Sequence, residues 1–222
     1  MFTRQTRELV VKSYTRELLN SAHARFLERA KGSTPLHAQE LWGEALDQCS
    51  KGWLDSPTPL DCTSERLVLN SEQFNPAFRF PVIQTDKVRA CDDRRHSLTN
   101  KACAVITPIR LVSWDRVNAL VNLFRDEGRL CHFSKCDHKS AYKSLPVDPN
   151  QTKYAVVVLK NPADGKYYAF TSNTLVFGSV ASVLHYNVFA RIITELCVRI
   201  FGIPLISFSM TLAVWFHPSS FP

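Results

Sequence analysis

Apolar residues recur at helical spacing in four parts of the chain. In residues 3–31 an apolar side chain returns every four positions, at Val10, Tyr14, Leu18, Ala22 and Phe26. This repeat drifts only slightly on a helix of 3.6 residues per turn, so it predicts an amphipathic helix that ends at Lys31-Gly32. Three further helices are predicted by the same criterion and by their end signals, at about 36–52, 113–125 and 179–201.

Short apolar runs between these helices predict strands. The runs Phe78–Ile83 and Lys87–Cys91 are separated by three polar residues, which is a hairpin-like length. A second hairpin is expected from Tyr154–Lys160 and Lys166–Phe170, because the intervening segment is rich in turn-forming residues. Helices mixed with antiparallel strands predict an α+β fold.

Residues 1–60 are expected to form a helical region, for which the sequence indicates no chemistry, ahead of a mixed region over 61–222. The chain has 222 residues, of which 45% are hydrophobic and 21% charged, as in folded domains. Its net charge of +7 favours a polyanionic partner, nucleic acid first, although a basic surface can also serve solubility alone.

Cysteine usage and the N-terminal sequence bear on the compartment. The seven cysteines are odd in number and contain no CxxC, which favours reduced thiols. The N-terminus lacks the apolar core of a secretory signal, so we expect an intracellular protein of nucleus or cytoplasm. The uncharged stretch from Ile200 to Phe216 is slightly short for a membrane span and contains Gly202 and Pro204, so no membrane role is expected.

The segment from His132 to Pro146 carries the first candidate chemistry. Asp137 follows a short predicted strand, and Ala141 and Tyr142 come four and five residues later. A carboxylate on a rigid element can hold a divalent metal against phosphates, but an Asp at a strand end usually serves as a turn residue. The flanking segments decide between these interpretations.

Two of those segments and the Asp137 segment, taken in order, resemble a reverse transcriptase. The first runs from Arg79 through Lys87-Val88-Arg89 and an acidic pair to Asn100, similar to a fingers signature in which a K-x-R strand precedes an acidic loop. The Asp137 segment resembles the first catalytic motif of the palm, with its D-x-x-x-A-Y/F pattern. Leu175-Val176-Phe177-Gly178-Ser179 resembles the glycine motif after the palm hairpin. The resemblance covers about residues 40–206 and favours a eukaryotic retroelement type.

The resemblance implies a role for each matching residue. Asp137 would ligate both catalytic Mg²⁺ ions, helped by the backbone carbonyl of His138. For the nucleotide, Arg89 and Lys87 would hold the triphosphate, since guanidinium suits phosphate geometry. Tyr142 would exclude a 2′-OH by its bulk, and Gly178 would let the backbone approach the base pair, since it has no Cβ. Each residue also has a structural interpretation: Tyr142 as core, Gly178 as a helix-start turn and Arg89 as a solvated charge.

The implied fold is the fingers and first half of the palm of a right-hand polymerase. Its antiparallel sheet would pack on the helices at 113–125 and 179–201. The implied reaction is synthesis of DNA from deoxynucleotide triphosphates (dNTPs) on a DNA primer and an RNA template, with two Mg²⁺ ions clamping the attacking and leaving oxygens.

The chain departs from this pattern after the long helix. The family supplies two more carboxylates from an Asp-Asp hairpin, but no Asp or Glu follows Glu195 here. We therefore expect the chain to be inactive or nearly so. Codons TCG-ATG-ACT for Ser209-Met210-Thr211 would contain GAT-GAC, which encodes Asp-Asp, one base out of frame. This suggests that a one-base deletion or a gene-model error near Ser207 replaced the hairpin and truncated the protein.

Other functions remain open at this point. The chain could be a non-catalytic nucleic-acid-binding remnant, an RNA-dependent RNA polymerase, or a relic without function. The bulky Tyr142 favours deoxynucleotides over ribonucleotides and so argues against the RNA polymerase.

Overall fold

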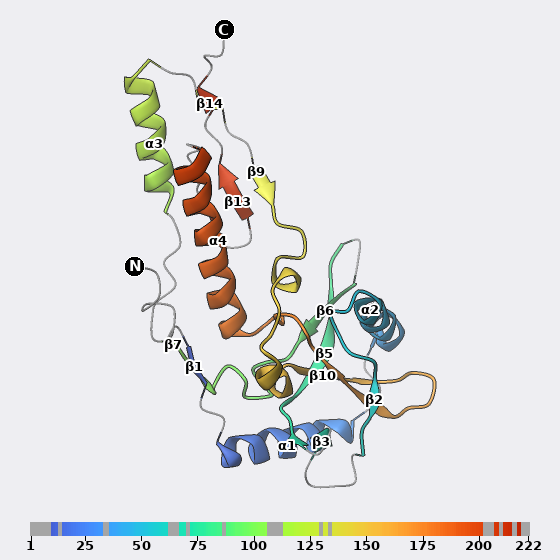
Figure 1. The fold of residues 1–222 in the computed structure, drawn as a ribbon. Helices are drawn as coiled ribbons and strands as arrows, with labels where there is room; N and C mark the ends of the chain where they lie inside the picture. Colours follow the sequence, from blue (N-terminus) through green and yellow to red (C-terminus); the bar gives the residue numbers. More distant parts are fainter. Residues whose placement is uncertain are drawn as a thin grey trace. The chain divides into compact units, whose positions relative to one another are not determined.

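The computed structural model of the chain forms two compact units (Figure 1). One comprises Met1–Ile106 and Tyr142–Ser182, and the other comprises Thr107–Ala141 and Val183–Pro222. The structure describes residues 10–12, 15–32, 36–61, 67–69, 72–85, 88–105, 113–128, 131–132, 135–201, 207–208, 211–214 and 217–218.

A five-stranded sheet forms the centre of the first unit. Its order is β2 (Thr58–Pro59), β11 (Tyr167–Thr171), β10 (Val156–Lys160), β5 (Pro76–Ile83) and β6 (Val88–Asp92). The predicted hairpins are confirmed, because β5 pairs antiparallel with β6 and β10 pairs antiparallel with β11. The expectation of a wholly antiparallel sheet is wrong: β10 runs parallel to β5. The long connection between β6 and β10 allows the chain to return in the same direction.

Helix α1 (Arg16–Ala30) covers one face of this sheet. The side chain of Thr15 caps the helix by accepting a hydrogen bond from the Leu18 backbone N–H at 3.2 Å. Phe26 on its buried face stacks on Phe78 of β5, with ring centroids 4.5 Å apart. Val156 and Val158 belong to the same core cluster.

Helix α2 (Ala38–Ser50) packs on the opposite face. Its Leu41 and Ala45 meet Leu159 and Phe170 in a second core cluster. Because alternate residues of a strand point to opposite faces, Val158 faces α1 and Leu159 faces α2. The apolar pattern of the sequence places Leu46 inward together with Leu41 and Ala45. This prediction is wrong for Leu46, whose side chain is exposed, and the polar Gln48 is buried instead.

The first predicted helix is shorter than expected. It begins at Arg16, and Val10–Lys12 instead form strand β1, which pairs antiparallel with β7 (Cys103–Val105). Two successive β-branched valines suit a strand, and cross-strand pairing here overrides the four-residue repeat. Tyr14 lies outside the described residues.

The remaining elements of the first unit are short. They are β3 (Val68–Leu69), paired antiparallel with β4 (Glu72–Gln73), and the 3₁₀ helix η2 (Pro149–Tyr154). A second 3₁₀ helix, η1 (Ala141–Ser144), lies at the boundary between the two units in the sequence.

The second unit contains helix α3 (Trp114–Asp126) and a three-stranded antiparallel sheet. The sheet order is β12 (Ser207–Phe208), β13 (Thr211–Val214) and β9 (Lys135–Asp137). A separate pair joins β8 (Cys131–His132) to β14 (His217–Pro218). Helix α4 (Val180–Phe201) begins in the first unit and runs for most of its length in the second. Both predicted helices and the strand that ends at Asp137 are confirmed.

The helices and mixed sheet establish an α+β fold. None of the helices in the described part of the chain has the length and apolarity needed to span a membrane.

Candidate functional site

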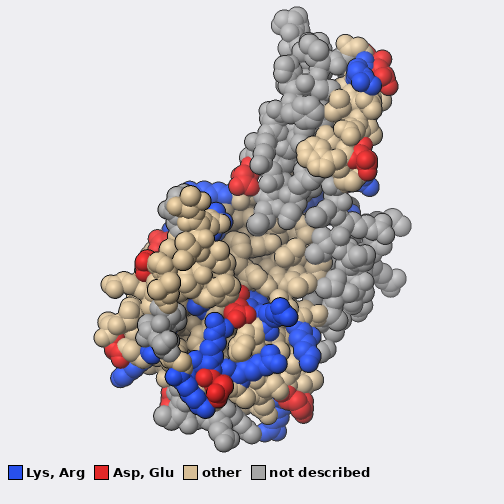
Figure 2. Space-filling view, turned by 180° about the vertical axis from the view of Figure 1, so that it is seen from behind, with Lys and Arg blue, Asp and Glu red and all other residues tan. Residues whose placement is uncertain are grey.

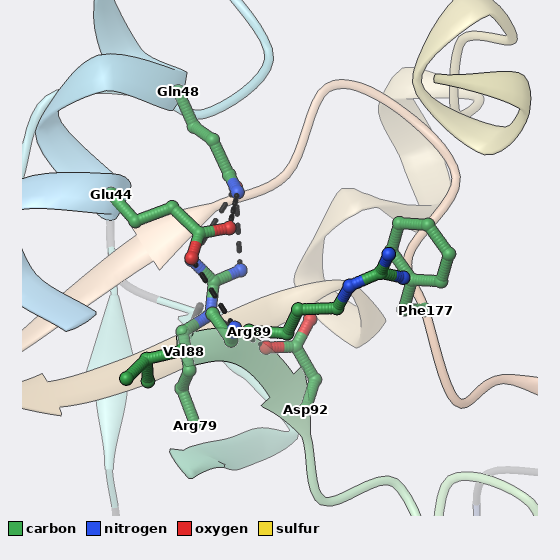
Figure 3. Close-up of a pocket in the computed structure, with 8 residues that line it drawn as sticks. Glu44, Gln48, Arg79, Val88, Arg89, Asp92 and Phe177 are labelled. Atoms are coloured by element: carbon green, nitrogen blue, oxygen red, sulfur yellow. Dashed lines mark hydrogen bonds and ion pairs between the residues drawn. The ribbon is translucent and has the colours of Figure 1, made fainter. Parts of the chain in front are cut away.

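A pocket of about 360 Å³ lies in the first unit, between α2 and the β5–β6 edge of the sheet. Its lining side chains come from α2, both strands and the turn before α4: Glu44, Gln48, Arg79, Val88, Arg89, Ala90, Asp92 and Phe177. Figure 3 shows Glu44 and Gln48 reaching down from α2 towards Arg79. Most of the polar groups are charged, so the pocket suits a charged rather than an apolar ligand.

A buried ion pair forms the floor of this pocket. Arg79 and Asp92 are directly opposite each other in the β5–β6 register, and Arg79 Nε donates to Asp92 Oδ1 at 2.8 Å. Both side chains are only 3% exposed. Arg79 also donates through both terminal nitrogens to Gln48 Oε1, each at 3.3 Å. A buried charge needs such partners, because an unpaired one is strongly destabilising.

The ionisation of the two partners agrees with this geometry. Burial raises the pKa of Asp92, but the charges of Arg79 and Arg94 more than offset burial and hold that pKa below its ordinary value. Burial lowers the pKa of Arg79, and the Asp92 carboxylate reverses the effect, so the guanidinium stays charged. The floor is therefore a fixed pair of opposite charges.

Glu44 is fixed in place on the α2 side. Its Oε2 accepts the backbone N–H of Ala90 at 3.2 Å, and its Oε1 accepts from Gln48 Nε2 at 3.0 Å. Glu44 and Gln48 are four residues apart and so share one face of the helix. Neither residue was predicted from the sequence, because the apolar pattern of this helix placed other residues on its inward face.

Arg89 and Phe177 form the more open side of the pocket. Arg89 is exposed on β6, and Figure 3 shows its side chain extending towards Phe177. Phe177 is 40% exposed. The Tyr142 ring, 6% exposed, makes an edge-to-face contact with Phe177, with centroids 5.0 Å apart. Burial raises the pKa of the Tyr142 phenol, so it stays protonated and neutral near neutral pH.

At Gly178 the turn before α4 packs against the acidic loop. Its φ of +78° is favourable only for glycine, and a Cβ there would lie 2.8 Å from the Asp92 carbonyl oxygen. Asn100 holds the same turn: its Nδ2 donates to the Gly178 carbonyl at 2.8 Å, and its Oδ1 accepts from the Val180 N–H at 3.0 Å. The backbone at Gly178 thus approaches the backbone of Asp92 closely. The predicted approach of this backbone to a base pair stays a prediction.

Lys143 is a buried charged residue that was not predicted from the sequence. It is 7% exposed and lies in η1, directly after Tyr142. Burial lowers its pKa to about 8; Asp92 and Glu44 raise it, and Arg79 and Arg94 lower it. No pattern in the sequence distinguishes this lysine from solvent-exposed ones.

Asp137 and His138 belong to the second unit. Asp137 is exposed at the end of β9 and pairs in register with Thr211 of β13. His138 Nδ1 is 2.9 Å from the Tyr186 hydroxyl, and its ring stacks on Phe189. The predicted role of the His138 backbone carbonyl stays untested.

The carboxylates of this part of the chain do not fit a two-metal centre. Across the described ranges, no three His, Cys, Asp or Glu side chains come together where they could hold a metal ion. The partner position to Asp137 is a threonine, and one carboxylate cannot hold two ions.

The structure therefore brings Arg89, Tyr142 and Gly178 into the first unit, where Arg89 lines the pocket and the other two flank its Phe177 side. Lys87 lies outside the described residues. Comparison with known proteins gives no assignment: no protein-family model matches the sequence, and no curated protein matches it significantly.

Proposed function

We propose that the chain is a fragment of an RNA-directed DNA polymerase, with fingers and an incomplete palm, that retains a nucleotide-binding pocket. The supporting observation is that two segments, each of which resembles the family on its own, come together at one pocket. Arg89 from the fingers-like strand and Phe177 from the glycine motif line one pocket, although they lie far apart in the sequence. The backbones of the same two segments meet where Gly178 packs on Asp92.

The pocket's chemistry suits a nucleoside triphosphate. The exposed guanidinium of Arg89 can donate two parallel hydrogen bonds to phosphate oxygens. The partly exposed ring of Phe177 offers an apolar surface for a sugar or base next to that charge. Tyr142, packed against Phe177, adds bulk on the same side and would disfavour a 2′-OH.

Nucleotide binding is tested by equilibrium dialysis of the purified chain with radiolabelled dATP and ATP. We expect dATP to bind more tightly than ATP, and Arg89→Gln to weaken both by about tenfold or more, as for loss of a charge-assisted hydrogen bond. Lys166→Gln, which removes an exposed lysine from a turn in the same unit, is the charge-matched control. Equal affinity of the wild-type chain and Arg89→Gln would refute the proposal. Preference for ATP would favour the RNA polymerase instead.

Catalysis is not expected of this chain. Its sequence places no Asp or Glu after Glu195, so the carboxylates that the family uses beside Asp137 are missing. Primer extension on an RNA template with Mg²⁺ and dNTPs should give no incorporation above background. Robust metal-dependent incorporation that Asp137→Ala abolishes would overturn this expectation.

A basic surface favours nucleic-acid binding as a second candidate function. Figure 2 shows Lys and Arg side chains grouped on one face of the first unit, with few acidic side chains among them. Arg25 is exposed on α1, and Arg95 is exposed in the acidic loop after β6. The Arg29–Asp93 ion pair, at 2.7 Å, joins this helix to this loop. Lys101 adds an exposed cation from the same loop.

Salt dependence tests this second function. Binding of a 20-nucleotide single-stranded RNA should weaken steeply between 50 and 200 mM salt, because phosphate contacts release counterions. The triple variant Arg25→Gln/Arg95→Gln/Lys101→Gln should show a shallower slope. A flat response of the wild-type chain would rule out an electrostatic nucleic-acid surface.

A further inference from the structure

The acidic loop and the turn before α4 meet beside the pocket. The loop continues directly from β6, which carries Arg89, and runs over residues 93–102 to the start of β7. The turn carries Phe177, which lines the pocket together with Arg89. The distance between these two side chains therefore depends on how firmly the loop and the turn are held together.

Asn100 of the acidic loop makes this connection through its side chain. Its Nδ2 donates to the Gly178 carbonyl at 2.8 Å, and its Oδ1 accepts from the Val180 N–H at 3.0 Å. Both partners are backbone groups, one on the residue directly after Phe177 and the other on the first residue of α4. The side chain of Asn100 therefore fixes the path of the backbone next to Phe177.

Asn100 is itself anchored within the loop. Its N–H donates to the Arg94 carbonyl at 3.3 Å, and its carbonyl accepts from the Cys103 N–H at 3.3 Å. On the turn, the Cβ position of Gly178 lies 2.8 Å from the Asp92 carbonyl oxygen, so the turn cannot approach the sheet edge more closely. The hydrogen bonds of Asn100 oppose the reverse movement, away from β6.

The carboxamide of Asn100 does more than cap a helix. Satisfying the first N–H of α4 requires only an acceptor, which an aspartate also supplies. The contact with the Gly178 carbonyl requires a donor, which a carboxamide has and an ionised carboxylate of the same shape lacks. This second contact is the one that holds the turn carrying Phe177.

We propose that Asn100 is a positioning residue, which holds Phe177 at a fixed distance from Arg89 and thereby determines how tightly the pocket binds the sugar and base of a nucleotide. The inference rests on the proposed nucleotide-binding function and extends it to a residue that does not touch the ligand. Arg89 holds the phosphates and Phe177 offers a surface to the sugar or base. A displaced Phe177 therefore weakens a nucleotide and spares a ligand that consists of phosphates alone.

The experiment compares the affinities of dATP and inorganic tripolyphosphate by isothermal titration calorimetry. We expect Asn100→Ala and Asn100→Asp each to lower the ratio of dATP affinity to tripolyphosphate affinity by about threefold to tenfold, as for loss of one hydrogen bond. Phe177→Ala should lower the same ratio. Adding Asn100→Ala to Phe177→Ala should cause little further change, because the asparagine acts through the phenylalanine.

The ratio separates positioning from the effect of an added charge. The new carboxylate in Asn100→Asp repels both ligands through their phosphates, so charge alone would leave the ratio nearly unchanged. Asn161→Asp is the matched control, because it adds the same charge in the β10–β11 turn and keeps the oxygen that accepts the Ala163 N–H at 3.0 Å. It should leave both affinities and their ratio unchanged.

The possible failures are distinguishable. If the wild-type chain binds neither ligand, the proposed nucleotide pocket itself is wrong, and the inference falls with it. If the wild-type chain binds both and Arg89→Gln weakens both, while folded Asn100 variants keep the wild-type ratio, the role of Asn100 alone is overturned.

Amide exchange in the wild-type chain decides the matter if the Asn100 variants do not fold. Because the Val180 N–H is bonded to the Asn100 side chain, dATP should slow its exchange more than tripolyphosphate does at equal saturation. Equal slowing by the two ligands would overturn the positioning role.

Discussion

A Cβ atom on Gly178 would lie 2.8 Å from the carbonyl oxygen of Asp92 and 3.5 Å from the Arg94 side chain. The glycine is therefore required twice, once by its φ of +78° and once by the backbone that packs against it. Real Cβ atoms do not approach a carbonyl oxygen so closely, and a backbone atom cannot move aside as the end of a flexible side chain can. This contact ties the turn before α4 to the edge of the sheet.

Gly178→Ala should destabilise the protein by more than its backbone conformation alone would cost. We expect a loss of about 2–4 kcal/mol in the free energy of unfolding, from the left-handed conformation and the overpacked contact together. Urea unfolding followed by tryptophan fluorescence measures this loss.

Gly165→Ala is the matched control, because Gly165 has a φ of +70° and nothing within 4 Å of its Cβ position. It should lose about 1–2 kcal/mol, which is the conformational cost alone. Equal losses in the two variants would mean that the packing of Gly178 against Asp92 contributes nothing to stability.

The local pattern of the sequence was sufficient for the two helices, the longer strands and the hairpins of the first unit, and insufficient for the long-range pairing of its strands. The β5–β6 hairpin follows from two apolar runs with three polar residues between them, which fixes an antiparallel neighbour. The parallel pairing of β5 with β10 joins segments about eighty positions apart, as in Val157 with Ala77. Nothing in either run specifies that partner, so long-range packing decides it.

The buried Arg79–Asp92 pair should be essential for the fold of the first unit. Arg79→Met leaves Asp92 buried with only the more distant Arg94 and Lys143 as cationic neighbours, and removing one partner of a buried pair costs about 3–5 kcal/mol. Lys31→Met is the control, because Lys31 and Glu28 form a pair whose side chains are 74% and 76% exposed, and its loss should change the unfolding midpoint very little. A small effect of Arg79→Met would show that Asp92 is accommodated without its partner, for example by protonation.

Acid should weaken the protein through Asp92. The pKa of Asp92 in the folded protein lies below that of about 3.9 in the unfolded chain, so the unfolded state binds more protons between the two values. The stabilisation by ionised Asp92 is therefore complete above about pH 5 and is lost as pH falls through the folded pKa.

The measurement is the difference in unfolding free energy between wild type and Asp92→Asn, followed from pH 6 to pH 2. This difference should be constant above pH 5 and shrink as the pH falls below 4. Asp126→Asn, at an exposed position on α3, should show no such trend. A difference that stays constant down to pH 2 would contradict the depressed pKa.

The candidate site was only partly accessible to sequence reasoning. Arg89 and Gly178 could be identified because each belongs to a short segment with a distinctive residue order. Glu44 could not, because its place in the pocket comes from the packing of α2 against β6, where its carboxylate accepts the Ala90 N–H. A contact between segments so far apart in the chain leaves no trace in either segment.

The last prediction concerns the carboxylates missing beside Asp137. Thr211 of β13 is paired in register with Asp137 of β9, so an acid at position 211 would stand next to the existing one. The double variant Met210→Asp/Thr211→Asp, which writes the out-of-frame Asp-Asp into the chain, should gain Mn²⁺ binding, because clustered carboxylates are the oxygen ligands that such cations prefer. Electron paramagnetic resonance of free Mn²⁺ measures this gain. The same double variant carrying Asp137→Asn should bind more weakly, and equal binding by the two chains would show that Asp137 is not part of the restored site.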